Sequence, residues 1–449
     1  MDATAADPAV EALRARLAAR RARIGVIGLG YVGLPLSVAA AEAGFEVLGF
    51  DINAQRVAAL NAGEDLIRHL RPGAVAGAVA SGRFEASADF ARLGEPDALL
   101  ICVPTPLTRH REPDLSFVRT TAEAIARQLR PGQLVVLEST TYPGTTDEVV
   151  RPILEATGLK SGRDFFLAFS PEREDPGNLD FGTARIPKVI GGDGAAALML
   201  AETLYAQFVV RTVPVSSTAT AEAVKLTENI FRAVNIALVN ELKVVFEAMD
   251  IDVWEVIEAA KTKPFGFMPF YPGPGLGGHC IPIDPFYLAW KAREFDVTAR
   301  FIELAGEVNT RMPYHVVDRL AEALDRRAGR GLSGARILLV GLAYKKNVDD
   351  TRESPSLKLM EILEARGAAA DFHDPFVPVV PPTREHPAFA GRRSVALDPG
   401  TLSPYDAALI ATDHDGIDYA GLVAACPLVI DTRDACRRAG IVSEKVVKA

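Results

Sequence analysis

The chain has little of several things, and each shortage excludes a class of protein. Its 449 residues include only four cysteines, which are too widely separated for a disulfide framework or a zinc site: Cys102, Cys280, Cys426 and Cys436. No apolar run is long enough to span a bilayer, and the first 23 residues lack the apolar core of a signal peptide. We therefore expect a cytoplasmic protein with no membrane partner, in which residues 1–22 form a helical extension.

Positive charge is also in short supply. The 49 basic residues are outnumbered by 58 acidic ones, which gives a formal net charge of −9 with histidine neutral. This balance argues against nucleic acid as the main partner. The seven histidines are scattered, and we expect no metal site. What is present is an ordinary globular composition, and the chain length predicts two or three domains.

The best-defined motif lies between residues 24 and 51, which read IGVIGLGYVGLPLSVAAAEAGFEVLGFD. A glycine-rich G-x-G-x-x-G turn follows a short apolar strand and precedes an alanine-rich helix, and an acidic residue closes the next strand. This arrangement is typical of a dinucleotide site, and the carboxylate favours NAD over NADP because it would repel a 2′-phosphate. The residues expected at the cofactor are Gly28, Gly30, Tyr31, Val32, Gly33 and Asp51.

Alternating strand and helix patterns continue after this motif. We expect strands at 97–104 and 133–140, helices over 115–130 and near 144–156, and two further strands in FFLAFSPE and PKVIGG. The alternation predicts a doubly wound parallel sheet. Thr105, Thr140 and Glu172 follow strand ends, where such sheets bind ligands. Each of them alone is explained as readily by a helix cap or a loop hydrogen bond.

The second half of the chain begins with a long helical pattern at about 218–249 that contains neither Gly nor Pro. Lys225 and Asn229 are four residues apart and share one face of it. A helix of this length is expected to connect domains and to pack against a second subunit, which predicts a homodimer or a larger homo-oligomer. Helices are expected at 285–294 and 299–328, and a second α/β unit begins near residue 331.

Residues 264–286 fit neither a helix nor a strand, since six of these 23 residues are Pro and five are Gly. This loop carries His279, Cys280 and Asp284. A cysteine beside an NAD site suits oxidation of an aldehyde, because addition of the thiol gives a tetrahedral thiohemiacetal from which hydride can leave. Asp284, with Lys225 and Asn229, could supply a base and an oxyanion donor. The alternative is a tight turn that contains a buried cysteine.

Seven motifs together resemble the UDP-glucose/GDP-mannose dehydrogenase family, and they cover nearly the whole chain from residue 23. In chain order they are GxGxxG with Asp51, VPTP, ESTTYPGT, SPERE, AEAVKLTEN, GPGLGGHCIPIDP and KKNVDDTRESP. The resemblance implies four-electron oxidation of the C6 alcohol of a UDP-sugar to a carboxylate, with NAD as cofactor, in an enzyme of polysaccharide biosynthesis. It implies a fold of two Rossmann-like doubly wound α/β domains joined by a long central helix and a middle helical domain. The domains would be 23–212 for NAD, 213–330 with the cysteine loop, and 331–449 for the UDP-sugar.

Site roles also follow from the resemblance. Cys280 would be the nucleophile, Lys225, Asn229 and Asp284 would assist it, and Thr140 and Glu172 would handle water and protons. Besides the glycine turn, the cofactor would contact Thr105, Thr140 and Arg352. The substrate-binding residues would be Glu172, Lys225, Asn229, Phe270, Tyr271, Gly275, Gly277, Tyr344 and Lys345.

Substrate choice is narrowed by the loop, because GPGLGGHCIPIDPFYL resembles the UDP-N-acetylglucosamine 6-dehydrogenases more than the UDP-glucose enzymes. The family's second glutamate is replaced by Pro176, which leaves open whether Glu174 substitutes for it. The role of His279 is likewise open. Alternative functions are the same chemistry on UDP-glucose or UDP-N-acetylmannosamine, a two-electron hydroxy acid dehydrogenase, and a non-catalytic NAD sensor. Two, one or no NADH per substrate would separate these classes.

Overall fold

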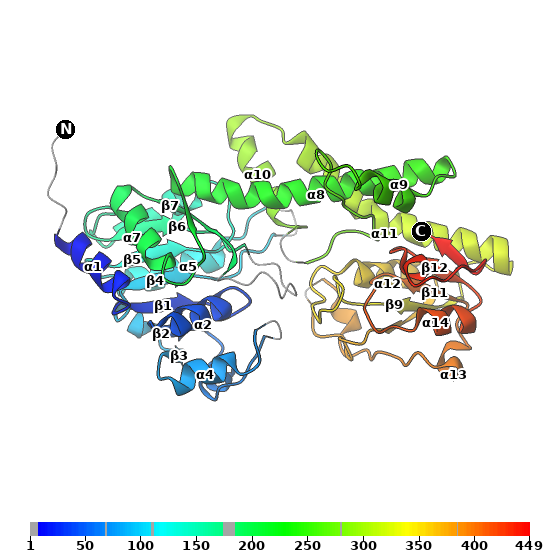
Figure 1. Ribbon diagram of the computed structural model, residues 1–449, viewed down its shortest axis with the longest axis horizontal. Coiled ribbons are helices and arrows are strands. Elements are labelled where there is room, and N and C mark those ends of the chain that lie inside the picture. The colour runs from blue at the N-terminus through cyan, green and yellow to red at the C-terminus, as the bar shows by residue number, and fades with distance from the viewer. Residues whose placement is uncertain (1–7, 68–69, 109–111, 174–184, 279–280, 384) are drawn as a thin grey trace. The chain divides into compact units, whose positions relative to one another are not determined.

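The structure is a computed structural model that describes residues 8–67, 70–108, 112–173, 185–278, 281–383 and 385–449 (Figure 1). The chain divides into two compact units, which we describe separately: unit 1 is Met1–Glu228 with Trp290–Val297, and unit 2 is Asn229–Ala289 with Thr298–Ala449. Helices α8 (Thr218–Ala248) and α10 (Asp284–Ala292) contribute residues to both units. Within the described ranges, no helix is long and apolar enough to cross a membrane.

Unit 1 is built on an eight-stranded sheet with the order β3-β2-β1-β4-β5-β6-β7-β8. The strands are β1 (Arg23–Ile27), β2 (Glu46–Phe50), β3 (Phe84–Ser87), β4 (Ala98–Ile101), β5 (Leu134–Leu137), β6 (Phe166–Phe169), β7 (Lys188–Gly192) and β8 (Thr212–Val215). Every residue of β4, β5 and β6 is buried. Such short, wholly apolar strands are what a sheet covered on both faces requires.

Helices cover both faces of this sheet. They are α1 (Pro8–Ala18), α2 (Gly33–Ala43), α3 (Ala54–Asn61), α4 (Ala74–Ala80), α5 (Ser116–Ala126), α6 (Arg151–Glu155) and α7 (Ala195–Tyr205). One apolar cluster joins the sheet to α1, α2, α4 and α7, and a second joins it to α5, α6 and the start of α8. The expected doubly wound architecture is therefore confirmed, as is the long helix α8, and helix α1 precedes β1.

One direction in the sheet differs from the sequence prediction. Strand β7 pairs with β6 in the antiparallel sense, with Ala168 opposite Gly192 and Phe169 opposite Gly191, whereas β8 runs parallel to β7. Two consecutive parallel neighbours need a crossover, usually a helix, and residues 171–187 have no helical pattern in their sequence. The sheet is thus mixed, and the prediction of a fully parallel sheet was wrong at this edge.

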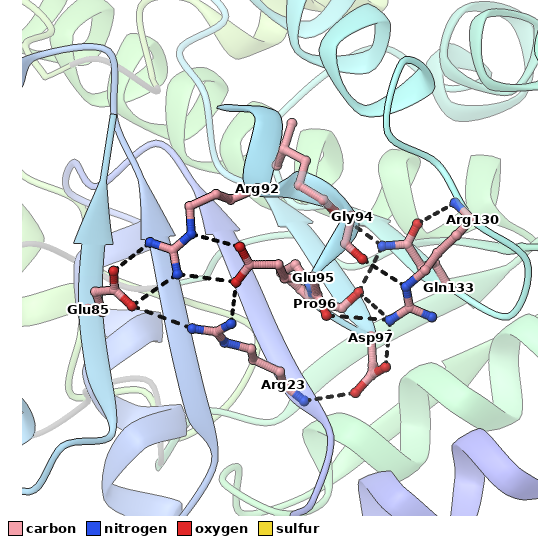
Figure 2. Close-up of polar contacts among 10 residues, drawn as sticks. Arg23, Glu85, Arg92, Gly94, Glu95, Pro96, Asp97, Arg130 and Gln133 are labelled. Carbon is pink, nitrogen blue, oxygen red and sulfur yellow. Dashed lines mark hydrogen bonds and ion pairs between the residues drawn. The ribbon is translucent and has the colours of Figure 1, made fainter. Parts of the chain in front are cut away.

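The amino-terminal side of the sheet is held by a network of polar contacts (Figure 2). Arg92 donates to Glu85 at 2.5 Å and to Glu95 at 2.8 Å, and Arg23 also pairs with Glu95. Arg130 pairs with the buried carboxylate of Asp97 at 2.7 Å. Exposed pairs of this kind contribute little each. In sheets of this kind, ligands bind at the opposite edge, at the carboxyl ends of the strands.

Unit 2 contains a five-stranded sheet of order β10-β9-β11-β12-β13, all parallel. Its strands are β9 (Arg336–Val340), β10 (Ala369–His373), β11 (Ala407–Ile410), β12 (Val429–Asp431) and β13 (Val446–Lys448). The helices are α9 (Val253–Ala260), α11 (Arg300–Ala328), α12 (Pro355–Ala365), α13 (Pro399–Leu402), α14 (Tyr419–Ala425) and α15 (Ala435–Arg438). Apolar clusters with α11 and α12 on one side and with α13, α14 and α15 on the other make this sheet doubly wound too.

The helical region rests on α8, an unbroken helix of 31 residues (Figure 1). Val239 on α8 packs with three residues of α9 in a small apolar cluster. Two buried amides tie α8 to α11, because Asn240 donates to Asn309 at 2.9 Å and Asn309 donates to the carbonyl of Ala233 at 3.1 Å. The sequence prediction did not include α3, α4, α7, α9, α13, α14, α15, β3, β8 or β13.

Candidate active site

The glycine-rich turn after β1 has the shape that its sequence predicts. Gly28 has a φ of +92°, and a Cβ added there would lie 2.5 Å from the carbonyl oxygen of Cys102. A Cβ on Gly33 would lie 1.9 Å from the carbonyl oxygen of Gly28, whereas a Cβ on Gly30 would meet nothing within 4 Å. Gly28 and Gly33 are therefore required by packing, and the backbone at Gly30 is open to a ligand. This open approach at the start of α2 fits a pyrophosphate.

Asp51, directly after β2, is held beside this turn. Its carboxylate accepts hydrogen bonds from the backbone N–H groups of Leu29 at 3.1 Å and Asn53 at 2.9 Å. Arg56 approaches it at 3.4 Å. Two carboxylate oxygens offer about four acceptor sites, so this group retains capacity for ribose hydroxyls. Tyr31 and Val32 in the same turn pack against the apolar cluster beneath it.

The ends of β4 and β5 are joined by side-chain hydroxyls. Thr105 donates to the carbonyl of Thr140 at 2.7 Å, and Ser139 donates to the carbonyl of Val103 at 2.7 Å. These bonds fix the two loops that carry Thr105 and Thr140 against each other. The structure thus brings together two residues that the sequence placed only at separate strand ends.

Glu172 lies three residues after the end of β6, at the same edge. Its Oε1 accepts from the backbone N–H of Arg173 at 2.6 Å, and its Oε2 lies 3.6 Å from Nζ of Lys188. Lys188 also donates to Glu138 at 2.6 Å. The sequence analysis missed both Lys188 and Glu138, because a single charged residue beside an apolar strand gives no signal of its partner.

Lys225, which is buried, lies on the part of α8 that belongs to unit 1. One turn earlier, Glu222 accepts from the backbone N–H groups of Gly144 at 2.5 Å and Thr146 at 2.9 Å. Burial raises the pKa of Glu222 to about 7. This carboxylate, which the sequence analysis also missed, holds the loop after Thr140 on the helix that carries Lys225.

In unit 2, the structure brings Asn229 and Asp284 together. The side-chain amide of Asn229 donates to a carboxylate oxygen of Asp284 at 2.5 Å, and both residues are buried. Asp284 is the first residue of α10, where a carboxylate is favoured by the helix dipole. Four residues discussed in the sequence analysis lie outside the described residues: Glu174, Pro176, His279 and Cys280.

The glycines of the loop before Cys280 allow it to pass close to the second α/β domain within unit 2. A Cβ on Gly277 would lie 2.5 Å from Cβ of Tyr344, and one on Gly275 would lie 3.3 Å from Cβ of Pro355. Gly278 donates its N–H to the carbonyl of Arg352 at 3.1 Å. The guanidinium of Arg352 pairs with Asp350 at 2.6 Å. Lys345 follows Tyr344 in the same partly exposed stretch.

Phe270 and Tyr271 lie on the α8 and α9 side of the loop. Phe270 meets Phe231 edge-on with ring centroids 5.7 Å apart. Tyr271 stacks on Trp254 with centroids 5.6 Å apart and donates its hydroxyl to Glu258 at 2.8 Å. These contacts anchor the loop, and the expectation that the two side chains touch substrate stays a prediction.

Two further anchors of the loop were missed by the sequence analysis. Gly273 donates its N–H to the buried side chain of Asn240 at 3.0 Å, and a Cβ on Gly273 would meet the guanidinium of Arg433. Asn240 lies in the apolar pattern of α8, and a polar residue at such a position was the available signal. Within the described ranges there is no group of three or more His, Cys, Asp or Glu residues that could hold a metal ion.

Known proteins resemble this chain over most of its length. Three models of the UDP-glucose/GDP-mannose dehydrogenase family match: the NAD binding domain over residues 22–209, the central domain over 219–311 and the UDP binding domain over 338–438. The chain is 36% identical over 398 residues to a UDP-N-acetyl-D-mannosamine dehydrogenase of Pyrococcus horikoshii, covering 87% of this chain and 89% of that protein. It is 38% identical over 359 residues to a UDP-N-acetyl-D-glucosamine 6-dehydrogenase of Pseudomonas aeruginosa, covering 79% and 83%.

A solved structure of a UDP-D-ManNAc dehydrogenase from Pyrococcus horikoshii superposes with a TM-score of 0.84 at 34% identity, covering 95% of this chain and 97% of that one. The expected NAD cofactor is confirmed by the matching NAD binding domain, and the turn at Gly28–Gly33 with Asp51 fits it. The resemblance drawn from the motifs is confirmed as well: the chain belongs to the UDP-glucose/GDP-mannose dehydrogenase family, whose members are nucleotide-sugar dehydrogenases.

Proposed function

We propose that this protein oxidises the C6 alcohol of a UDP-N-acetylhexosamine, with UDP-N-acetylglucosamine as the preferred substrate, to the uronate with reduction of two NAD. The observation that carries the proposal is the buried hydrogen bond between Asn229 and Asp284. Asp284 follows Cys280 by four residues, and Asn229 follows Lys225 by one helical turn. A two-electron hydroxy acid dehydrogenase has no need of a cysteine at this position of the sequence.

The chemistry proceeds in two oxidations. NAD, when bound, accepts the hydride that leaves C6 in each of them. After the first oxidation, the Cys280 thiolate adds to the C6 aldehyde to form a thiohemiacetal, whose oxidation gives a thioester. Water then hydrolyses the thioester, which releases the carboxylate and the thiol.

In this mechanism Lys225 and Asn229 stabilise the developing oxyanion, because an ammonium and an amide are both donors. Asp284 takes the proton from the thiol, and Thr140 and Glu172 orient water and transfer its proton. Tyr344 and Lys345 bind the UDP-sugar, and Arg352 contacts the cofactor.

The substrate assignment rests on the family's UDP binding domain and on the loop at 270–277. Relatives of this chain are named for N-acetylmannosamine and N-acetylglucosamine substrates, and we assign the acetamido group to this protein as well. Phe270 and Tyr271 fix the loop through their contacts with α8 and α9, while Gly275 and Gly277 let it approach Tyr344 and Pro355. A pocket shaped for an acetamido group would leave UDP-glucose with unpaired polar groups, at a cost of about 1–3 kcal/mol per missing contact.

The same proposal covers the organisation of the molecule. Residues 23–212 bind NAD, residues 213–330 carry the cysteine loop, and residues 331–449 bind the UDP-sugar, after an N-terminal extension of residues 1–22. The enzyme works in the cytoplasm as a homodimer or a larger assembly, and its product enters polysaccharide biosynthesis.

The deciding experiment measures NADH formed per substrate and catalytic efficiency with five sugars side by side. These are UDP-N-acetylglucosamine, UDP-N-acetylgalactosamine, UDP-N-acetylmannosamine, UDP-glucose and GDP-mannose. We expect two NADH per turnover and the highest kcat/KM with UDP-N-acetylglucosamine. A highest value with UDP-glucose or GDP-mannose would overturn the acetamido assignment, and one NADH per substrate would overturn the four-electron chemistry.

A matched variant tests the thiol. Cys280→Ser should stop net uronate formation while binding of NAD is unchanged, because the glycine turn and Asp51 are untouched. Uronate formation at the parental rate would show that Cys280 is not the nucleophile.

A further inference from the structure

A buried group of charges lies at the carboxyl edge of the unit 1 sheet, beside Glu172. Lys188 donates to Glu138 at 2.6 Å, and the hydroxyl of Tyr205 donates to the other oxygen of Glu138. The second carboxylate facing Lys188 is Glu172, at 3.6 Å. Lys188 and Glu138 are 3% and 1% exposed. The ammonium of Lys188 therefore lies between the buried carboxylate of Glu138 and the carboxylate of Glu172 at the candidate site.

The reversed direction of β7 is what brings this ammonium to the site. Lys188 is the first residue of β7. In a parallel strand its first residue would lie at the amino-terminal edge of the sheet, far from Glu172. Because β7 is antiparallel to β6, its first residue lies instead at the edge where β6 ends and Glu172 follows.

Lys188 remains charged in this position. Burial by itself lowers the pKa of a lysine, but Glu138 and Glu172 outweigh burial and raise the pKa of Lys188 above its ordinary value. Burial raises the pKa of Glu138, while Lys188 and Tyr205 oppose that rise. Among the described residues, Cys102 also faces this cluster. Beside Glu172, Arg173 is paired with Glu228 at 2.5 Å.

An ammonium has three donors, and Glu138 engages one of them. If the pair served the fold alone, a well-packed apolar pair of similar volume would do as well, because the desolvation cost of buried ion pairs is large. What an apolar pair could not supply is a fixed positive charge at 3.6 Å from Glu172.

We propose that Lys188 is a positioning residue for Glu172: its ammonium, fixed by Glu138 and Tyr205, orients the Glu172 carboxylate to take a proton from water. The inference rests on the proposed role of Glu172 in water activation. Lys188 itself touches neither substrate nor cofactor in this role and acts only through Glu172.

The test compares two variants of the buried Lys188–Glu138 pair, one that removes its positive charge and one that removes its negative charge. Lys188→Met removes the cation that faces Glu172, whereas Glu138→Gln leaves that cation and removes a competing anion. We expect Lys188→Met to lower kcat by about 10- to 100-fold with little change in the KM for NAD. The acid limb of its kcat/KM profile should move to higher pH by about one unit or more, and that of Glu138→Gln should move to lower pH.

A purely structural role predicts a different pattern, in which both variants lose thermal stability and neither moves the acid limb. Lys188→Arg keeps the charge and should restore the limb towards its parental position. In the double variant Lys188→Met with Glu172→Gln, the loss in kcat should not exceed that of Glu172→Gln alone, because Lys188 acts through Glu172. Additive losses would overturn the inference.

Two outcomes separate this inference from the proposed function. If Glu172→Gln keeps the parental kcat, the assigned role of Glu172 is wrong and the inference falls with it. If Glu172→Gln is impaired but Lys188→Met and Glu138→Gln leave the acid limb in place, the function stands and the inference alone is overturned. Should Lys188→Met not fold, the downward shift expected for Glu138→Gln still decides the question.

Discussion

At Asp51, one carboxylate is bound by the backbone beside the glycine-rich turn and is predicted to set the choice of cofactor. Backbone N–H groups of Leu29 and Asn53 hold it in place, and its negative charge disfavours a 2′-phosphate. The guanidinium of Arg56 forms an ion pair with this carboxylate at 3.4 Å.

Asp51→Ser should therefore shift the preference from NAD towards NADP. We expect kcat/KM with NAD to fall by about tenfold or more, since the ribose hydroxyls lose a charged acceptor worth about 1.5–3 kcal/mol. The value with NADP should rise, because Arg56 becomes available to a phosphate. Steady-state kinetics with both cofactors measure this. Adding Arg56→Ala should abolish the gain with NADP, and an unchanged preference in the single variant would contradict the role of Asp51.

The pKa of Glu222 predicts how the stability of the fold depends on pH. Burial raises that pKa from 4.5 to about 7, so the folded state binds the proton more tightly than the unfolded state does. The stability associated with this group is fully present below about pH 4.5 and is lost as the pH rises through about 7.

Glu222→Gln removes this titration. Relative to the parent, the thermal midpoint of the variant should rise between pH 5 and pH 8, by an amount equivalent to about 1–3 kcal/mol. Differential scanning calorimetry across this range provides the measurement. Glu123→Gln, an exposed position of α5, is the matched control and should follow the parent at every pH. Parallel curves for Glu222→Gln and the parent would show that Glu222 does not titrate in this range.

At the scale of elements, the loop at 273–278 depends on glycine for close packing. Gly277→Ala would place a Cβ 2.5 Å from Cβ of Tyr344 and 2.9 Å from Cδ of Pro355, so the loop must move. We expect uronate formation to fall by about 100-fold while NAD binding is retained. Gly331→Ala is the control, because a Cβ there meets nothing within 4 Å. Full activity in Gly277→Ala would mean that the loop tolerates this displacement.

The sequence predicted those elements whose pattern is local. The turn at Gly28–Gly33 and the helix α8 each carry their signal within one stretch, and both are confirmed. Polar contacts made across the fold were not predicted. Asn240 reaches Gly273 and Asn309, and Glu222 reaches Gly144, yet each appears in the sequence as one polar residue in a helix.

Strand direction is the other feature that local patterns could not give. An apolar run such as PKVIGG has the same alternation whichever way the strand runs. The direction depends on the connection between β6 and β7, and it is this direction that places Lys188 beside Glu172. The candidate residues Thr140 and Glu172 were found from strand ends, whereas the group that faces Glu172 needed the sheet topology.

At the scale of the whole molecule, both sheets have a glycine with positive φ after one strand and an aspartate after the neighbouring strand. Gly341, after β9, has a φ of +88°, and a Cβ added there would lie 2.3 Å from the carbonyl oxygen of Thr412. Gly28 has the same relation to the carbonyl oxygen of Cys102. Asp374 after β10 accepts from the N–H of Leu342 at 2.6 Å, as Asp51 accepts from Leu29. Asp374, however, is paired with the wholly buried His414 at 3.0 Å. Asp374 is therefore engaged by a buried side chain, whereas Asp51 retains acceptor capacity for ribose hydroxyls.

The exposed surface of α8 bears on assembly. Phe231, Leu238 and Val245 are 48%, 52% and 45% exposed, and their spacing of seven residues puts them on one stripe of the helix. A contiguous apolar stripe on the exposed face of a helix is typical of a protein–protein interaction site. A second copy of the chain is the occupant we expect, because a two-fold axis across α8 would pair each stripe with its own equivalent.

Leu238→Glu combined with Val245→Glu should therefore lower the molar mass from that of a dimer, or a multiple of it, to that of a monomer. Carboxylates on both faces of a two-fold interface would be buried next to like charges, which costs several kcal/mol. Light scattering at micromolar concentration measures the mass. Val442→Glu, at a position 97% exposed in unit 2, adds charge without touching the stripe and should leave the assembly intact. A monomeric parent protein, or a double variant of unchanged mass, would contradict an interface on α8.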